Sequence, residues 1–371
     1  MSDFIPLSVP NLSGNELDYL IDAVKSGWIS TSGGRISEFE EKLARYLKIE
    51  KVAAIQSGTA GLHLAMILSG VGYGDEVIVP TLTFIATVNP VRYVGAEPIF
   101  MDCDDYLCLD VEKVAKFIKT ECGFVDSKLI NRTTKRTIKA VVAVHIFGNM
   151  VDMYALMELA QKYNLKVIED ATEALGSYYK ATGDFAGTIG DFGVYSFNGN
   201  KIITTGGGGA ITARNSDLVD RARYLANQAK DYEEKFVHNE IGYNYRMTNL
   251  QAVIGIAQLE QLEQFIAIKE KNYNLYKAAG LNLLSFQDNT RSNKWFYSFV
   301  TDKRDELLSR LKASGIQSRP IWSLIHALRP YKRCQSYMIS KATEYWQKVV
   351  NIPCSTNLTP EEINYIVSKV L

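Results

Sequence analysis

Short apolar runs of strand length alternate with amphipathic stretches along the first part of the chain. The helical pattern ISEFEEKLARYL places Ile36, Phe39, Leu43 and Leu47 on one face, because residues three and four apart share a helix face. The apolar runs that follow are KVAAI, EVIVP, AEPIFMD, IKAVVAVH and LKVIED, with helical patterns between them. This alternation predicts an α/β sandwich around a parallel sheet with right-handed crossovers, with the ligand at the carboxyl ends of the strands.

The pattern changes near residue 250. A long helix is predicted to begin near Thr248 and to connect two domains. Beyond it, WFYSFV and IQSRPIW are typical of strands, and a helix is expected over residues 304–314 between them. We therefore predict an N-terminal arm and large α/β domain over residues 1–250, and a small α+β domain over residues 251–371. The polar segment 127–137, SKLINRTTKRT, is predicted to be a surface loop.

The composition is that of a folded protein without a global charge. Of the 371 residues 47% are hydrophobic, and 41 basic residues balance 41 acidic ones. Such a chain has no net field to attract nucleic acid or an anionic membrane. No apolar stretch is long enough to cross a bilayer. We expect neither kind of partner.

Cysteine and histidine usage favours a cytoplasmic protein without a metal site. The five cysteines form no CxxC pair, which argues against a disulfide framework or structural zinc. The N-terminus carries acids and prolines where a signal peptide needs a basic start and an apolar run. The four histidines lack metal-ligand spacing. His145 and His326 are candidates to hydrogen-bond a ligand, although a structural role is the default for each.

One lysine stands in an unusual context. Lys201 lies in SFNGNKIITTGGGG, just before the four consecutive glycines 206–209. A lysine that forms a Schiff base must lose its proton, which desolvation or neighbouring positive charge promotes. The glycines let a flat cofactor approach the backbone closely. Most lysines are solvated surface residues, so this context is what makes Lys201 the candidate nucleophile.

A carboxylate stands at the end of the buried run LKVIED. Asp170 in this position can bond a pyridinium nitrogen and keep it protonated, which is what makes pyridoxal phosphate (PLP) an electron sink. The alternative is a helix N-cap, because Asp is common at strand-to-helix junctions. From periodicity alone, the N-cap is the favoured interpretation.

The segment QSGTAGLHLAM contains a candidate phosphate site. Ser57, Gly58 and Thr59 open a helix whose N–H groups and dipole favour an anion, and the Ser196 hydroxyl is a further candidate donor. Capping uses the same residue types, so a purely structural turn is the alternative. Phe84, in PTLTFIATVNPV, is a candidate to stack on a cofactor ring, with a core position as the alternative.

Taken in order, these segments resemble the fold-type I PLP aminotransferases of the DegT/DnrJ/EryC1/StrS family. The resemblance spans nearly the whole chain and is carried by GWIS, FEEKLARYL, QSGTAGLHLA, PTLTFIATVNPV, EDATEALG, SFNGNKIITTGGGGAI, GYNYRM and RPIW. It implies the α/β aspartate aminotransferase-like fold, with a large domain on a mixed, mainly parallel sheet and a smaller α+β C-terminal domain. It also implies PLP as the cofactor and a homodimer with shared active sites.

The resemblance also implies roles for individual residues. Lys201 would form the internal aldimine, Asp170 would pair with the ring nitrogen, and Phe84 would stack on the ring. Asn244 would reach over from the neighbouring subunit to the phosphate. The implied cofactor contacts are Ser57, Gly58, Thr59, Phe84, Asp170, Glu173, Ser196, Lys201 and Asn244. The candidate substrate contacts are Trp28, Ser30, His145, Arg319 and His326.

Two details depart from the commoner form of the family. Glu173 occupies a position that is often glutamine near the cofactor's phenolic oxygen, and its role stays open. The run TTGGGG lacks the acidic residue of TxGEGG and is more similar to enzymes that aminate UDP-linked 4-keto-6-deoxy-N-acetyl sugars, of the bacillosamine and legionaminic acid type. The resemblance therefore implies amination of a UDP-linked keto sugar at C4, in polysaccharide or O-antigen biosynthesis.

The implied reaction is a ping-pong transamination with L-glutamate as amino donor. Lys201 would then serve as base and acid for the proton shift. Two alternatives stay open: a PLP-binding regulator without transaminase activity, and a PLP-dependent sugar dehydratase. The dehydratases of this family replace the lysine with histidine, so Lys201 argues against that branch. The balanced charge and the lack of a helix-turn-helix signal argue against DNA binding.

Overall fold

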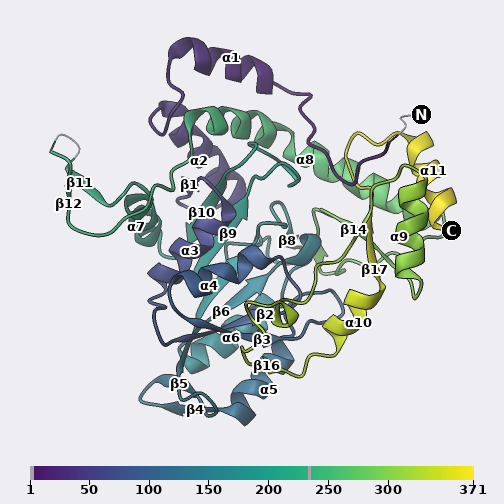
Figure 1. Cartoon of the computed structure of the whole chain (residues 1–371). Coiled ribbons are helices and arrows are strands. Elements are labelled where there is room, and N and C mark those ends of the chain that lie inside the picture. The colour runs from purple at the N-terminus through teal and green to yellow at the C-terminus, as the bar shows by residue number, and fades with distance from the viewer. Residues whose placement is uncertain (1–3, 233–234) are drawn as a thin grey trace.

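A large sheet forms the centre of the protein in a computed structural model, which describes residues 4–232 and 235–371 (Figure 1). Its strands are β1 (Ala53–Ile55), β2 (Glu76–Pro80), β3 (Glu97–Met101), β4 (Cys122–Val125), β5 (Lys128–Asn131), β6 (Thr137–Val144), β7 (Lys166–Asp170), β9 (Phe192–Ser196), β10 (Gly209–Ala213) and β16 (Ser336–Tyr337). They lie in the order β1-β10-β9-β7-β6-β2-β3-β16, and β5 pairs with both β4 and β6. Strands β9, β7, β6, β2, β3 and β16 run parallel, whereas β10 is antiparallel to both neighbours. This mixed, mainly parallel sheet confirms the predicted α/β fold.

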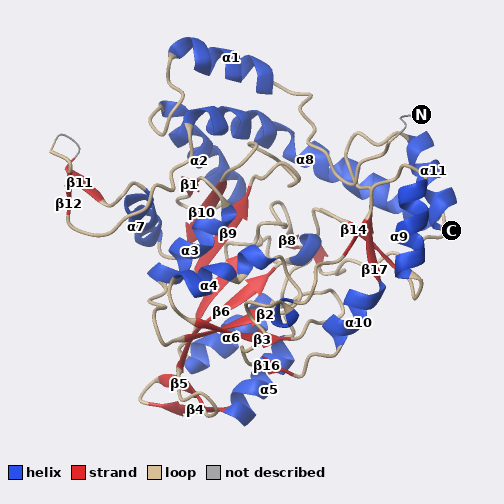
Figure 2. Cartoon of the chain, viewed as in Figure 1, coloured by secondary structure: helices blue, strands red, loops and turns tan. Residues whose placement is uncertain are grey.

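Helices surround the sheet (Figure 2). Those that precede or follow its strands are α1 (Glu16–Ser26), α2 (Gly34–Leu47), α3 (Gly58–Leu68), α4 (Asn89–Tyr93), α5 (Val111–Glu121), α6 (Met153–Tyr163) and α7 (Ser216–Ala226). The face of α2 that the sequence predicted, with Ile36, Phe39, Leu43 and Leu47, is buried. Helix α3 is buried along most of its length because β9 and β10 pack against it.

A 30-residue helix, α8 (Asn249–Ala278), runs from the large sheet to the C-terminal part of the chain (Figure 1). It begins where the sequence predicted, because Thr248 and Gln251 form a capping box: each side chain bonds the backbone N–H of the other. The C-terminal part contains β14 (Tyr297–Val300), α9 (Arg304–Ala313), β15 (Arg319–Pro320), α10 (Lys341–Lys348), β17 (Val349–Ile352) and α11 (Pro360–Val370). Strands β14, β17 and β15 form a small antiparallel sheet. The remaining short pairs are β8 (Tyr178–Tyr179) with β13 (Thr290–Arg291) and β11 (Lys230–Tyr232) with β12 (Val237–His238).

The structure departs from the sequence prediction at two places. Segment 127–137, expected as a surface loop, contributes β5 to a hairpin with β4. Its two-residue turn, Asp126 and Ser127, has positive φ at both positions, as a tight hairpin turn requires. Strand β16, from the predicted small domain, joins the large sheet beside β3, so the C-terminal segment contributes to both sheets.

We call the part of the chain around the large sheet the large domain, and the part around the β14-β17-β15 sheet the small domain. The N-terminal arm runs along the small domain. Ile5 N donates to Gly315 O at 2.8 Å, and Cys354 N donates to Leu7 O at 2.9 Å. The described start of the arm and the C-terminal helix α11 therefore lie on the same side of the protein (Figure 1). Within the described ranges, no helix combines the length and the apolarity that crossing a bilayer needs.

Candidate active site

A cavity of about 450 Å³ lies at the carboxyl ends of the parallel strands, between the large and small domains. The large domain and arm line it with Leu7, Gln56, Ser57, Gly58, Thr59, Leu62, Phe84, Ala86, Thr87, Asp170, Thr172, Glu173, Ser196, Asn198, Asn200, Lys201, Gly207 and Gly208. The small domain lines it with Trp295, Phe296, Arg319, Pro320, Trp322 and Asn351. The position is the one expected for a ligand in a parallel α/β sheet.

Lys201 is enclosed by this cavity, and its side chain is only 13% exposed. Its Nζ lies 4.1 Å from the centre of the Trp295 ring and 3.8 Å from Glu173 Oε1. Burial lowers the pKa of the Lys201 ammonium, whereas the negative charges of Glu173 and Asp170 act in the opposite direction. Desolvation thus favours the neutral amine that a nucleophile or base requires.

Glu173 is the second carboxylate of the cavity and is buried. Its Oε2 accepts a hydrogen bond of 3.0 Å from the backbone N–H of Phe147. Burial raises the pKa of Glu173 to about 7, against the opposing effect of Lys201. The side chain therefore changes charge near neutral pH, beside the candidate nucleophile.

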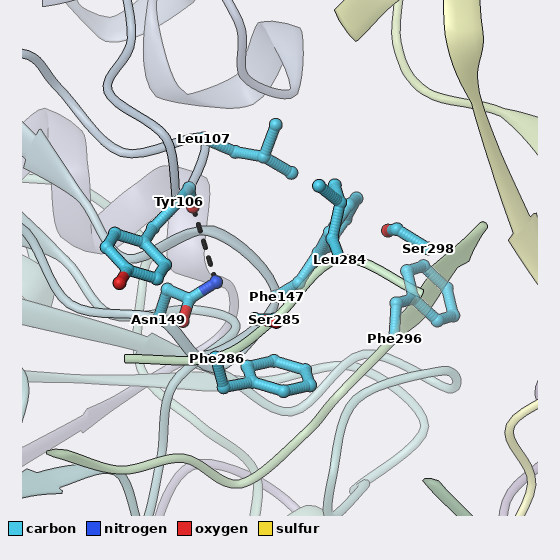
Figure 3. A pocket seen from close by; sticks show the side chains of 9 residues that line it. All are labelled: Tyr106, Leu107, Phe147, Asn149, Leu284, Ser285, Phe286, Phe296 and Ser298. Atoms are coloured by element: carbon cyan, nitrogen blue, oxygen red, sulfur yellow. Dashed lines mark hydrogen bonds between the residues drawn. The ribbon is translucent and has the colours of Figure 1, made fainter. Parts of the chain in front are cut away.

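Phe147 adopts a left-handed backbone conformation, with φ 54°. This conformation is uncommon for a residue with a side chain, and it directs the Phe147 N–H to Glu173. The Phe147 ring packs on Trp322 with centroids 5.1 Å apart. Behind it lies a smaller pocket, where Asn149 Nδ2 donates to Tyr106 O at 3.3 Å (Figure 3).

Asp170 is the last residue of β7 and lines the cavity. Its Oδ2 accepts from Thr87 Oγ1 at 2.6 Å, and its Oδ1 accepts from Thr172 N at 3.2 Å. The N-cap interpretation is wrong, because turns rather than a helix follow Asp170. The carboxylate therefore remains available to a ligand in the cavity.

The start of α3 forms an anion site in the same cavity. Ser57 is the N-cap residue, and its side chain accepts from Ala60 N at 3.1 Å. Gly58 and Thr59 begin the first turn, where the backbone N–H groups lack partners within the helix. Ser57 thus caps the helix and lines the cavity, so the two interpretations of this turn are compatible.

Close packing requires glycine at two positions near the start of α3, Gly58 and Gly209. A Cβ on Gly209 would lie 2.7 Å from the carbonyl carbon of Ser57 and 2.8 Å from Gly58 N. A Cβ on Gly58 would lie 2.9 Å from Thr172 Cγ2 and 3.1 Å from Ser196 Cβ. Only glycine lets α3 begin this close to β9 and β10.

Phe84 is 51% exposed at the cavity, so it is not the core residue that one interpretation allowed. Its ring faces Trp322 of the small domain, with centroids 6.3 Å apart. An exposed aromatic ring at a cavity that also contains a nearly buried lysine offers a surface on which a flat ligand can stack.

Five predicted contacts do not line the cavity of the single chain. They are Trp28, Ser30, His145, Asn244 and His326. His145 is fully buried: Val151 N–H donates to its Nδ1 at 3.2 Å, so its Nε2–H donates to Glu169 at 2.8 Å. Neighbouring residues on a strand point to opposite faces, and His145 lies with Glu169 on the face opposite Asp170. The substrate contact expected of His145 is therefore not supported by its position.

His326 is bound to the large domain instead of facing the cavity. Its Nδ1 lies 2.6 Å from Thr81 Oγ1, and its ring packs near Phe100. Trp28 is 59% exposed on the single chain, and Ser30 O accepts from Asn249 N at 2.7 Å. Asn244 bridges to Asn227 outside the cavity. Arg319 does line the cavity, where it and Lys201 are the two cations among the described residues.

Sequence reasoning missed Thr87, Trp295 and Asn351. Thr87 could have been found from TFIAT, because a spacing of four places its hydroxyl on the same side of a turn as Thr83. Trp295 and Asn351 carried no local signal. They reach the cavity only through folding of the small domain.

These residues fit PLP. The cavity offers a nearly buried amine for the aldehyde, a carboxylate for the ring nitrogen, an exposed aromatic ring for stacking, and a helix N-terminus for the phosphate. A site that combines these groups on this fold defines the class of fold-type I PLP enzymes.

Comparison with known proteins agrees with this class. A sequence model of the DegT/DnrJ/EryC1/StrS aminotransferase family matches residues 10–371. The chain is 36% identical to a GDP-perosamine synthase of Escherichia coli O157:H7, covering 99% of this chain and 98% of the relative. It is 27% identical to a UDP-4-amino-4,6-dideoxy-N-acetyl-beta-L-altrosamine transaminase of Campylobacter jejuni, covering 98% and 95%. Among solved structures it resembles the aminotransferase TlmJ from Streptoalloteichus hindustanus, with a TM-score of 0.89 and 27% identity over 99% of this chain and 98% of that one.

The chain belongs to the DegT/DnrJ/EryC1/StrS aminotransferase family. It is therefore a PLP-dependent sugar aminotransferase. This membership confirms the enzyme and the cofactor that the sequence implied, and it removes the support for a regulator without transaminase activity.

Proposed function

We propose that this enzyme transfers the amino group of L-glutamate to C4 of a nucleotide-linked keto-deoxy sugar, in two half-reactions at one cavity. The observation that carries the proposal is the nearly buried Lys201, whose Nζ lies beside Glu173 in a cavity that Asp170 and the start of α3 also line. Bound PLP supplies the electron sink for proton loss from the carbon that carries nitrogen.

The chain's own residues would bind and move protons. The N–H groups of Gly58 and Thr59 and the hydroxyl of Ser196 would hold the phosphate, and Phe84 would support the ring. In the glutamate half-reaction, Lys201 Nζ would take the proton from the amino-bearing carbon of the substrate and return it to the cofactor carbon bonded to the same nitrogen, and the sugar half-reaction would reverse this transfer. The lowered pKa of Lys201 favours the neutral amine that accepts the proton. Glu173 Oε1, 3.8 Å from Lys201 Nζ, is within ion-pair distance but beyond direct hydrogen-bond reach, so its charge would tune the basicity of Lys201.

The comparisons support a GDP-linked sugar better than the UDP-linked sugar that the glycine run implied. Three relatives named GDP-perosamine synthase are 35–37% identical to this chain. Two relatives named for UDP-linked amino sugars are 27–29% identical. We therefore propose a GDP-linked 4-keto-6-deoxy sugar as the substrate.

The first experiment follows the visible spectrum of the PLP-loaded enzyme when L-glutamate is added. The wild type should lose the absorption of bound PLP and form 2-oxoglutarate, whereas Lys201→Ala should do neither. Lys303→Ala, at a side chain 79% exposed, is the matched control and should behave as wild type. No spectral change in the wild type would contradict the assignment of glutamate.

The second experiment offers GDP- and UDP-linked 4-keto-6-deoxy sugars to the glutamate-treated enzyme. The expected result is a GDP-amino sugar, identified by mass spectrometry, with kcat/KM for the GDP sugar at least about tenfold above that for the UDP sugar. A preference for the UDP sugar would restore the prediction made from the glycine run. Lack of product with either sugar would refute both.

We also propose a homodimer with shared active sites. Helix α1 exposes Leu17, Ile21 and Val24, which are 68%, 40% and 60% exposed and share one face. Trp28, just beyond the helix, is also exposed. A partner subunit that covered this stripe would bury apolar surface that the single chain leaves in water. Asn244 would then reach the phosphate of the neighbouring site.

A further inference from the structure

Two hydroxyl groups form a chain that ends on Asp170. Thr87 Oγ1 donates to Asp170 Oδ2 at 2.6 Å, and Thr83 Oγ1 lies 2.9 Å from Thr87 Oγ1. Thr83, Thr87 and Asp170 are all buried, with 1%, 2% and 3% of their surface exposed. Such groups persist in an interior only when their hydrogen bonds are satisfied.

The direction of the chain follows from the number of hydrogens. A hydroxyl has a single hydrogen, and the Thr87 hydrogen is committed to the carboxylate. Thr83 must therefore donate to Thr87. Successive donation polarises both hydroxyls toward Asp170. The hydrogen bond from Thr87 to Asp170 is therefore stronger than one from a hydroxyl that accepts no hydrogen bond itself.

The local fold builds this chain and the aromatic surface of the site together. Phe84 precedes a 3-10 turn over Ile85–Thr87, and Thr87 N donates to Phe84 O at 3.0 Å. The turn leaves the Phe84 ring exposed at the cavity and folds Thr87 back onto the end of β7. The other Asp170 oxygen has the longer bond to Thr172 N, at 3.2 Å.

We propose that Thr87, with Thr83 behind it, is a positioning residue that holds the Asp170 carboxylate in place for the ring nitrogen of PLP. The inference rests on the role proposed for Asp170 itself. Without Thr87, one oxygen of a buried carboxylate would lose its hydrogen-bond donor among the described residues. Asp170 would then keep only the longer bond from Thr172 N, which leaves its carboxylate less firmly oriented toward the ring.

The test measures PLP binding rather than turnover. Thr87→Val keeps the shape of the side chain and removes the hydroxyl, and Thr87→Ser restores the hydroxyl. The full chain is titrated with PLP, and visible circular dichroism of the bound cofactor reports its orientation. Loss of a hydrogen bond to a charged group should weaken PLP binding about tenfold in Thr87→Val and change the dichroic band, and Thr87→Ser should recover both. Thr83→Val should show a smaller loss in the same direction.

A matched control separates positioning from stability. Thr212 is also buried and donates from Oγ1, to Gly187 O at 2.6 Å, but it does not line the cavity. Thr212→Val should leave the PLP affinity and the dichroic band unchanged. In an Asp170→Ala background, Thr87→Val should have no further effect, because the two residues act as one unit.

Two outcomes separate this inference from the proposed site. If Asp170→Ala binds PLP as wild type does, the role of Asp170 fails and the inference fails with it. If Asp170→Ala weakens binding but Thr87→Val stays within twofold of wild type, with the same dichroic band, only the role of Thr87 is overturned.

Discussion

The Nζ atom of Lys201 lies 4.1 Å from the centre of the Trp295 ring, so a side chain of the small domain covers the candidate nucleophile of the large domain. The same indole donates from Nε1 to Asn200 O at 2.6 Å. Trp295 therefore holds both the backbone before Lys201 and the amine itself.

Replacement of Trp295 by Phe should keep a ring over Lys201 and leave Asn200 O without its donor. Asn200 is an exposed residue, so the loss is that of an ordinary hydrogen bond, about 0.5–1.5 kcal/mol. We expect the unfolding free energy from urea titration to fall by that amount and the glutamate half-reaction to slow. Trp346→Phe, at a partly exposed position on α10, is the control. Equal effects of the two variants would show that Trp295 has no special relation to Lys201.

Much of the large domain and of its site was predictable from sequence because the signals are local. Asp170 ends a strand pattern, Ser57 and Lys201 follow strand patterns, and the carboxyl ends of parallel strands meet at one edge of the sheet. The β4–β5 hairpin was not predicted because its strands have only four residues each and β5 lies within a polar segment whose composition is that of a loop. Its two-residue turn becomes apparent only from the backbone conformation.

The remaining errors concern the sheet face on which a side chain lies and the contacts between residues far apart in the sequence. His145 directly follows β6 and Asp170 ends β7, yet His145 lies on the opposite face with Glu169. No local pattern indicates on which face a residue beyond a strand end will lie. Trp295 and Asn351 come from the small domain, far along the chain from Lys201. Their contacts depend on how the two domains pack.

Glu173→Gln should remove an ionisation near pH 7. Burial raises the pKa of Glu173 from 4.5 to about 7. Between about pH 4.5 and 7 the folded state keeps a proton on Glu173 that the unfolded state releases. The free energy of unfolding of the wild type therefore falls as the pH rises through this range. Glutamine never ionises, so relative to wild type Glu173→Gln should gain about 2 kcal/mol of unfolding free energy between pH 5 and pH 8.

The measurement for Glu173 is urea unfolding at both pH values, together with the pH profile of the glutamate half-reaction, which should lose its transition near pH 7 in the variant. Glu158→Gln, at an exposed position of α6, should change neither. An unchanged transition would assign it to another group of the cavity.

Asp102 joins the large domain to the C-terminal segment. Its carboxylate is fully buried, contacts Lys113 Nζ, and accepts from the backbone N–H groups of residues 340–342. Burial acts to raise its pKa, but Lys113 and these N–H groups outweigh it and hold the pKa at about 2. The ionised Asp102 carboxylate therefore stabilises the folded state above pH 3.8, and this stabilisation is lost as the pH falls toward 2.

Asp102→Asn should lower the unfolding free energy at pH 7 by about 3 kcal/mol, since it leaves Lys113 and several N–H groups poorly paired. Hydrogen exchange of segment 336–345 should accelerate. Asp105→Asn is the control, because Asp105 is 76% exposed and its pair with Lys341 contributes little. Equal exchange in the two variants would contradict the role of Asp102 as the link between the segments.

Arg319 should bind the anionic groups of both substrates in turn. Besides Lys201 it is the cation that lines the cavity, and it has no ion-pair partner among the described residues. Arg319→Met should raise KM for glutamate and for the nucleotide sugar about tenfold or more, because a hydrogen bond to a charged group is lost in each case. The free energy of unfolding of the Arg319→Met variant should differ from that of the wild type by less than about 0.5 kcal/mol, as for other exposed positions. A KM change for only one substrate would restrict Arg319 to that half-reaction, and no change for either would refute the prediction.

Dimer formation can be tested on the exposed stripe of α1. Leu17→Asp with Val24→Asp places two charges on a face that a partner subunit would bury, and burying an unpaired charge costs several kcal/mol. We expect the variant to sediment as a monomer in the analytical ultracentrifuge while the wild type sediments as a dimer. PLP should bind more weakly to the monomer, since Asn244 of the second chain would no longer reach the phosphate. Asp18→Ala, on an adjacent exposed position, should leave the dimer intact. A monomeric wild type with full PLP affinity would show that each chain completes its own site.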